Sequence, residues 1–464
     1  MKSALLLLFA WVAAFNAQAH GFEERYDLPV PLAYVIVGAC AMVLLTFVVA
    51  LVFVRRPASG DVPLATPIPF GLSLPKPAPL HPLAWLIKGP SLLLFALTLA
   101  SALWGTNDPL MNLAPTLVWI IWWIGLSFVV IVLGNVWPVL DPWRSSFELL
   151  DIFAKKLGVQ RGLVLGWAWP TRLGMWPAAM LLLFWCALEV IYPLATSPFK
   201  MGYLAVAWTV VNLAGMACFG RQVWQAHADV FAVYFSRLAR TFRPCLIAFE
   251  AVPLAGQIGF ILAMLATVLF DGLHGGQTWL VFDGALKAWI PQWLDVNGYV
   301  AGTLGLLSVW VFFLLAYLLI CQICAGMTSS AVTGKKIAHQ MAPTLIPIAA
   351  AYLIAHNFSN LLIQGQTIIA LLSDPLGLQW DLLGTAKFYP DISVVDAKLT
   401  WLVAVIAIVA GHVLSIWQAH RIALTWGLPT RRTALATLPL TALMIAYTAI
   451  SLVVIAAPMV NDIP

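Results

Sequence analysis

Charge is scarce in this sequence. Only 9% of its 464 residues are Asp, Glu, Lys or Arg, whereas about a quarter of the residues are charged in a typical soluble domain. Apolar residues make up 62% of the chain, and they gather in continuous runs of about 20 residues, the length that spans a bilayer as a helix. Since unpaired backbone groups are costly in hydrocarbon, these runs predict an all-α bundle of membrane-spanning helices rather than a soluble domain.

Several motifs are also lacking. The chain has no Walker P-loop, no GxSxG elbow, no HExxH and no glycine-rich dinucleotide fingerprint, which argues against nucleotide-driven transport and serine hydrolysis. It has no zinc-finger or basic-arm pattern, so no nucleic-acid partner is expected. The six cysteines lie within or at the edge of apolar runs and show no disulfide framework.

The N-terminus has the pattern of a cleavable secretion signal. Lys2 precedes an apolar run that is too short to span, and the sequence AQA then ends at Ala19. Signal peptidase cleaves after such a small-x-small pattern. We therefore predict a signal peptide at residues 1–19 and a single integral membrane domain at residues 20–464, with His20 as its first residue.

Ten apolar segments follow the signal and predict about ten spans. If the mature N-terminus is periplasmic, the inner loops hold 18 Lys and Arg residues and the outer loops 5, as the positive-inside rule requires. This predicts a multi-pass protein of a bacterial inner membrane, in contact with the lipid bilayer and with both termini in the periplasm. The expected spans are 31–54, 85–104, 114–134, 174–193, 203–219, 246–270, 299–323, 343–371, 399–419 and 434–457.

Two inner segments are expected to lie along the membrane surface as amphipathic helices. In residues 141–157 apolar side chains recur at helical spacing, and Ser145 with Glu148 forms a possible capping box. Residues 222–240 repeat the pattern. Glu189 falls within an apolar run, and its side chain is expected to extend toward the headgroups.

The eighth span carries polar side chains that lipid disfavours. His356, Asn360 and Gln364 recur every four residues and so share one helix face. Such a stripe must face protein or water, which makes it the strongest functional candidate in the chain. Asn357 and Gln366 lie beside it, and we expect these four amides to orient a substrate.

The ninth span adds His412 at a similar depth. Because His356 and His412 each lie roughly 15 Å from the inner ends of their helices, neighbouring helices could bring the two rings together. They would then bind a divalent metal, zinc or copper, or act as a general base. Interhelical hydrogen bonds, haem ligation and quinone binding are the alternatives. His20 offers a separate copper site, through its ring and the mature N-terminal amine, and His420 is expected near the headgroups.

Several stretches resemble a known family. HGFEERYDLPVPL, GNVWPVLDPW, AHNFSNLLIQGQ and GHVLSIWQAHRIAL are similar to stretches of the bacterial membrane proteins known as fenitrothion hydrolases, and the resemblance runs over nearly the full length. It implies hydrolysis of an organophosphate triester, an apolar small molecule, with release of a nitrophenol.

The resemblance brings no catalytic residues with it. The histidines supply one route, because a metal ion that they bind would lower the pKa of a water molecule and so generate the attacking hydroxide. Two other functions remain open. One is a transporter or metal (copper) permease that uses the same polar stripe as its path, and the other is a haem or quinone anchor for a partner subunit.

Overall fold

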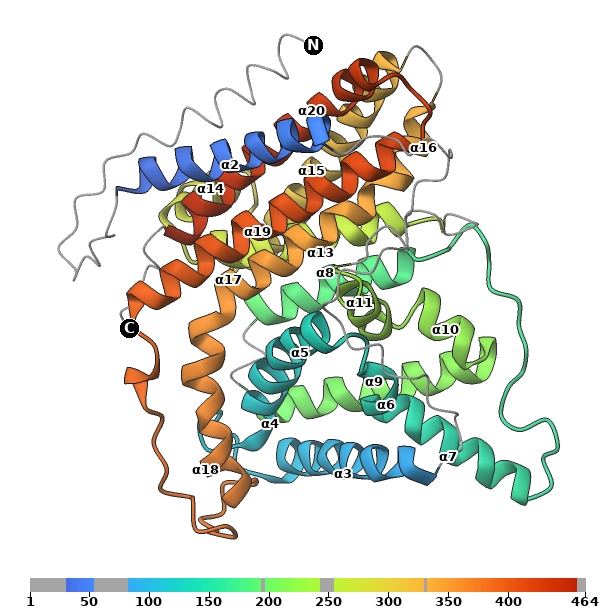
Figure 1. The fold of residues 1–464 in the computed structure, drawn as a ribbon. Coiled ribbons are helices and arrows are strands. Elements are labelled where there is room, and N and C mark those ends of the chain that lie inside the picture. Colours follow the sequence, from blue (N-terminus) through green and yellow to red (C-terminus); the bar gives the residue numbers. More distant parts are fainter. Residues whose placement is uncertain (1–30, 54–81, 193–196, 243–253, 329–331, 457–464) are drawn as a thin grey trace.

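The computed structural model describes residues 31–53, 82–192, 197–242, 254–328 and 332–456 (Figure 1). The predicted signal peptide, residues 1–19, and His20 lie outside the described residues. Within those ranges every regular element is a helix and none is a strand, which confirms the all-α prediction.

Nine helical stretches in the described part of the chain are long and apolar enough to cross a membrane. This length and composition make the chain a multi-pass membrane protein. Seven of the stretches are single helices, namely α2 (Leu32–Phe53), α3 (Pro82–Trp104), α9 (Pro198–Phe219), α13 (Gln257–His274), α15 (Tyr299–Met327), α19 (Ala397–Leu424) and α20 (Thr430–Ala456). The other two are composite, and consist of α4 (Leu113–Pro115), η2 (Thr116–Gly125) and α5 (Leu126–Leu133), and of α16 (Gly334–Met341), η3 (Ala342–Leu345), α17 (Ile346–Gln364), η4 (Gly365–Thr367) and α18 (Ile368–Ser373).

The remaining predicted span is a shorter helix. Residues 174–193 contain α8, Trp176–Val190, which has 15 residues. At about 1.5 Å per residue this helix is roughly 22 Å long, less than the hydrocarbon thickness of about 30 Å. It packs against α13, the helix whose residues are most thoroughly buried among the long ones. A total of ten spans therefore stays a prediction.

The packing of α17 against α19 forms the centre of the bundle, where the two helices run side by side (Figure 1). Gly411 makes the close approach possible. A β-carbon at this position would lie 2.5 Å from Cβ of Ala351 and 2.7 Å from the carbonyl oxygen of Pro347. Small residues at helix contacts are the usual device for close packing in membranes, where van der Waals contact is a main driving force.

We expect Gly411→Ala to destabilise the protein by about 1–3 kcal/mol, because the added methyl group overpacks a tight helix contact. Gly326→Ala on α15 is the matched control, since no atom lies within 4 Å of its added methyl. There the usual gain of helix propensity, roughly 0.5–1 kcal/mol, should stabilise the protein. Thermal unfolding in detergent measures both variants, and an equal effect of the two would contradict the close contact.

An unusual helix lies beside α17. Ten residues, from Thr116 to Gly125, form the π-helix η2, a wide helix that is rare and is found frequently at functional sites. It carries three tryptophans, and the ring of Trp122 packs 4.6 Å from that of Phe231. The indole nitrogen of Trp123 donates a hydrogen bond of 3.0 Å to Glu189. Glu189 is therefore bonded to a neighbouring helix, and its extension toward the headgroups stays a prediction.

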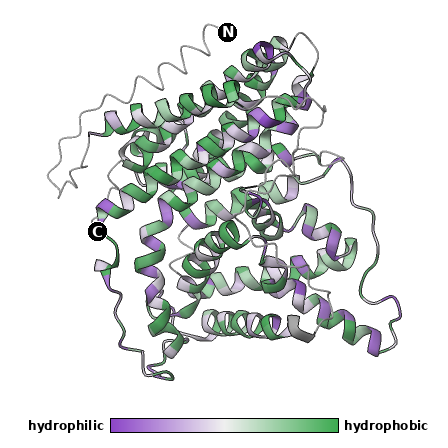
Figure 2. Cartoon of the chain, viewed as in Figure 1, coloured by the Kyte–Doolittle hydropathy of each residue, from purple (hydrophilic) through white to green (hydrophobic). Residues whose placement is uncertain are grey.

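Short helices connect the spans. On the predicted inner side these are α6 (Trp137–Leu140), α7 (Pro142–Lys156), α10 (Arg221–His227) and α11 (Val230–Leu238), and on the predicted outer side α14 (Gln277–Lys287) and η5 (Ile392–Val394). Figure 2 shows the long helices as largely hydrophobic, with hydrophilic residues prominent on α7 and near the helix ends. A helix is present in each of the two expected inner segments, and the second is divided into α10 and α11. Most of α11 is buried in the bundle, where Phe231 packs against Trp122, so this part does not lie along the membrane surface as predicted.

The predicted cap of the first inner helix is wrong. Helix α7 begins earlier, at Pro142, and its N-cap is Asp141, whose side chain accepts a hydrogen bond from the backbone N–H of Arg144. Ser145 is buried inside the helix, so it cannot cap it. Proline is well suited to the first helical turn because its missing N–H needs no partner there.

Glu148 has a tertiary role in place of the predicted capping role. Its carboxylate accepts a hydrogen bond of 2.5 Å from Lys88 on α3 and one of 3.1 Å from Arg144, and it also pairs with Arg221 on α10. The Lys88 side chain is only 2% exposed. One carboxylate therefore joins three cations from three helices at this end of the bundle.

Candidate functional site

The candidate site centres on a buried pair of side chains from two neighbouring helices. Nε2 of His356 on α17 lies 3.1 Å from Oδ2 of Asp271 on α13. The His356 side chain is 12% exposed and that of Asp271 is 33% exposed. The imidazole is thus held inside the protein, while its carboxylate partner is partly exposed near the end of α13.

Tyr352 lies one helical turn before His356, on the same side of α17. The two rings are stacked with their centroids 6.2 Å apart. The Tyr352 hydroxyl reaches α13 beside Gly272, where a β-carbon would come within 2.5 Å of it. The missing side chain at Gly272, next to Asp271, therefore makes room for this hydroxyl.

His412 is buried deeper than His356. Its side chain is 1% exposed, and its Nδ1 lies 2.8 Å from the carbonyl oxygen of Ile408, one turn earlier on α19. A ring N–H at Nδ1 donates this hydrogen bond, which leaves Nε2 as the acceptor. The ring of Tyr447 on α20 lies 5.9 Å away, centroid to centroid.

The two histidines have different partners in the structure. Gly411 is level with Pro347 and Ala351 on α17, so His412 lies beside the first half of that helix. His356 is further along, by roughly 10 Å at 1.5 Å per residue. Tyr352 lies between the two levels, and a site that contains both imidazoles would include its ring.

The predicted amides are placed differently from one another. Asn357 is buried and donates a hydrogen bond of 3.3 Å to the carbonyl of Leu353 on its own helix. Asn360 is partly buried and Gln364 is exposed, so the stripe runs from the protein interior to the helix end. Gln366 exchanges two hydrogen bonds with the backbone of Asp391, which ties the long connection after α18 to the bundle.

The described residues contain no group of three or more His, Cys, Asp and Glu side chains placed to hold a metal ion. Zinc enzymes usually supply three protein ligands, and His356 with Asp271 supplies two. The residues in the described ranges therefore do not form such a ligand set. A zinc or copper ion at His356, His412 or His20 stays a prediction.

Asp271 is the site residue that the sequence did not reveal. It lies at the end of an apolar run, directly after the predicted span 246–270, where an acidic residue reads as part of a loop. The structure continues α13 to His274, which brings Asp271 into the helix and against α17. The sequence FDG, an acid followed by a glycine at a span end, was the available signal.

Two buried carboxyl groups lie on the short inner helices, away from this site. Oδ1 of Asp229 caps α11 by accepting hydrogen bonds from the N–H groups of Phe231 and Ala232. Burial raises the pKa of Asp229 to about 8, and the charge of Asp141 adds to the shift. Burial also raises the pKa of Asp141 to about 6, against the opposing effect of Arg144.

These raised values predict that stability falls with increasing pH. The pKa of Asp229 is higher in the folded state than its usual 3.8. Its contribution to stability is therefore fully present below pH 3.8 and is lost as the pH rises to about 8. Each titrating group costs up to about 1.4 kcal/mol per pH unit in this window. Asp229→Asn keeps the capping oxygen and cannot ionise, so its unfolding free energy should decline less steeply between pH 5 and pH 8.

Thermal unfolding in detergent across this pH range measures the slope. Asp391→Asn is the control, because hydrogen bonds from Ser393 lower the pKa of Asp391 and that carboxylate stays ionised throughout. Equal slopes for Asp229→Asn and the unsubstituted protein would contradict a protonated Asp229.

Comparison of the chain with protein-family models, with characterised proteins and with solved structures finds no match.

Proposed function

We propose that the chain is a membrane-embedded hydrolase in which His356, oriented by Asp271, is the general base. The observation that carries the proposal is the hydrogen bond of 3.1 Å between the His356 ring and the Asp271 carboxylate. The proposed substrate is an apolar organophosphate triester, the class implied by the resemblance of the sequence to fenitrothion hydrolases.

The Asp271–His356 pair has the chemistry that a general base needs. A ring N–H at Nε2 donates to the carboxylate, which fixes the tautomer and leaves the lone pair of Nδ1 to accept a proton. The carboxylate also stabilises the imidazolium that forms when the base takes up a proton. A water molecule at Nδ1 would lose its proton to the ring as its oxygen forms a bond to phosphorus.

The leaving group completes the reaction. The bond from phosphorus to the aryl oxygen breaks, nitrophenolate departs, and the proton held by His356 passes to solvent, so the base is regenerated. An apolar triester partitions into the bilayer, which would bring it to a site between membrane helices. Asn360 and Gln364, roughly 6 and 12 Å further along α17 at 1.5 Å per residue, are the proposed contacts for the polar phosphoryl group.

Purified protein supplied with fenitrothion tests the proposal directly. We expect release of the nitrophenol, followed by its absorbance, at a rate proportional to protein concentration. Solute uptake by proteoliposomes without ester cleavage would support the permease instead, and a Soret band in the purified protein would support the haem anchor. Metal analysis after gentle purification determines whether zinc or copper accompanies the protein.

The proposed topology places the site toward the periplasm. The distribution of Lys and Arg supports ten spans with both termini periplasmic in a bacterial inner membrane. The end of α13 that carries Asp271 then lies on the outer side. The mature chain should begin at His20, and mass spectrometry tests this cleavage. Cleavage there would support a periplasmic N-terminus, on which the rest of the topology depends.

A further inference from the structure

A group of buried polar atoms next to the Asp271–His356 pair forms no hydrogen bond to any residue outside the group in the described part of the chain. The atoms are the hydroxyl oxygens of Tyr352, Tyr447 and Ser451 and Nε2 of His412. Tyr447 is 8% exposed and the other three residues are 1% exposed or less. They come from α17, α19 and α20, helices that pack against one another.

These four side chains lie close together. The rings of His412 and Tyr447 are 5.9 Å apart, and Ser451 follows Tyr447 by one turn of α20. A β-carbon on Gly272 would lie 2.5 Å from the Tyr352 hydroxyl and 3.0 Å from Cγ1 of Val454. The Tyr352 hydroxyl is thus beside α20, within one turn of Ser451.

Buried polar groups of this kind are normally bonded to internal water, which makes about three hydrogen bonds each. The present group offers both donors and acceptors, because a hydroxyl can do either and Nε2 of His412 accepts while Nδ1 is bonded to Ile408. Water molecules that bridge these atoms would connect Tyr352, and through it His356, to His412.

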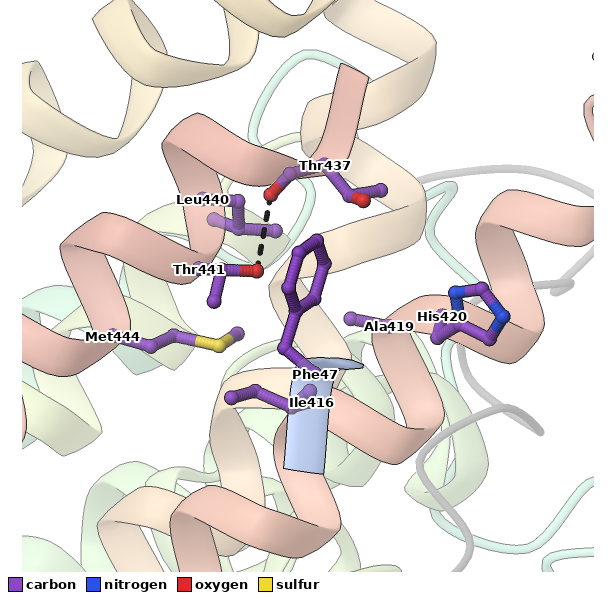
Figure 3. Close-up of a pocket in the computed structure, with 8 residues that line it drawn as sticks. All are labelled: Phe47, Ile416, Ala419, His420, Thr437, Leu440, Thr441 and Met444. Atoms are coloured by element: carbon purple, nitrogen blue, oxygen red, sulfur yellow. Dashed lines mark hydrogen bonds between the residues drawn. The ribbon is translucent and has the colours of Figure 1, made fainter. Parts of the chain in front are cut away.

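One further polar side chain lies between His412 and a small cavity along the same two helices. Ser415, buried one turn further on α19, lies 3.7 Å from the sulfur of Met444. Met444 lines a small cavity, which His420, Thr437 and Thr441 also line (Figure 3). Figure 3 shows the Thr441 hydroxyl donating a hydrogen bond to the backbone carbonyl of Thr437 beside this cavity. Phe47 of α2 projects between the labelled residues of α19 and α20. His420, predicted near the headgroups, is 2% exposed.

We infer that Tyr352, Tyr447, Ser451 and His412 hold a chain of internal water molecules that conducts protons between the Asp271–His356 pair and the cavity at His420. Chains of acidic residues and histidines through a bundle are typical of proton pathways in membranes. A proton that enters at Asp271 passes through His356 and the bridging waters to Nε2 of His412. His412 then releases it to water on the far side and returns to its neutral form. The route requires no ester and is independent of the proposed hydrolysis.

Proteoliposomes test the inference. Vesicles of phosphatidylethanolamine and phosphatidylglycerol, with entrapped pyranine and high internal potassium, become negative inside when valinomycin is added. We expect vesicles containing the protein to acidify at least tenfold faster than vesicles without it. Tyr447→Phe, which removes one hydroxyl, and the smaller change Ser451→Ala should each remove most of this difference.

Tyr317→Phe is the matched control. Tyr317 is buried on α15, and its hydroxyl donates a hydrogen bond of 2.7 Å to the carbonyl of Ala338, outside the proposed route. This variant should conduct as well as the unsubstituted protein. Acidification no faster than in protein-free vesicles, or equal rates for the Tyr447→Phe and unsubstituted proteins, would overturn the inference.

Radiolytic hydroxyl-radical labelling gives a second measurement that depends on no variant. Internal water generates the radical in place, so Tyr352 and Tyr447 should be oxidised although they are buried, while Tyr317 should not. Equal protection of all three tyrosines would mean that the buried atoms hold no water and would refute the route. Hydrolysis and proton flux are measured separately, so either proposal can fail while the other stands.

Discussion

Replacing His356 with alanine should reduce the hydrolysis of an organophosphate triester by about 10²- to 10⁴-fold, the usual contribution of a general base. Asp271→Asn should reduce it at least tenfold, because an amide cannot stabilise the imidazolium or fix the tautomer in the same way. Initial rates of nitrophenol release by purified variants measure both effects. The KM for the ester should change little, since neither side chain is proposed to hold the aryl group.

His227→Ala is the matched control for this experiment. His227 lies on the inner helix α10, where its Nδ1 lies 2.8 Å from the carbonyl oxygen of Val223, so it is a partly buried histidine outside the site. Its replacement should leave the rate unchanged. Full activity of a folded His356→Ala protein would refute the assignment of the base, and His356→Gln provides a more conservative variant if the alanine protein does not fold.

Glu148→Gln should have the largest effect on stability, a loss of about 3–5 kcal/mol, as expected when one partner of a buried ion pair is removed. The substitution leaves the ammonium of Lys88, whose side chain is 2% exposed, without a counter-charge. It also leaves Arg144 and Arg221 facing each other without the carboxylate between them. Thermal or denaturant unfolding in detergent measures the loss.

Asp151→Asn on the same helix is the control for Glu148. Asp151 pairs with Lys155 at 2.7 Å, and that lysine is 53% exposed, so the pair should contribute less than about 1 kcal/mol. A double variant that adds Lys88→Met to Glu148→Gln should recover part of the lost stability, because it removes the stranded charge. Equal losses for Glu148→Gln and Asp151→Asn would show that Lys88 finds another partner.

The first inner helix illustrates the limit of local motifs. Its sequence predicts Ser145 with Glu148 as the cap, whereas in the structure Asp141, directly before a proline, caps the helix. Glu148 instead pairs with Lys88 on α3, 60 residues earlier. No periodicity within residues 141–157 contains that information.

In the candidate site, too, the sequence predicts one part of the arrangement and only the structure shows the other. The four-residue spacing of His356, Asn360 and Gln364 follows from helix geometry alone, so the sequence predicts the stripe. The partner of His356 comes from α13, and neither its distance nor its orientation is encoded in either helix. The structure pairs His356 with Asp271 and places His412 beside Tyr447, whereas the sequence favoured pairing the two histidines.

The sequence by itself determined that this protein is a helical membrane protein and the approximate positions of most of its long helices, because the cost of an unpaired backbone in hydrocarbon makes a helix the solution for a long apolar run. Tertiary structure alone decided which polar side chains meet. Lipid gives no hydrophobic preference among helix faces, so close packing at residues such as Gly411 and hydrogen bonds between helices set those pairs.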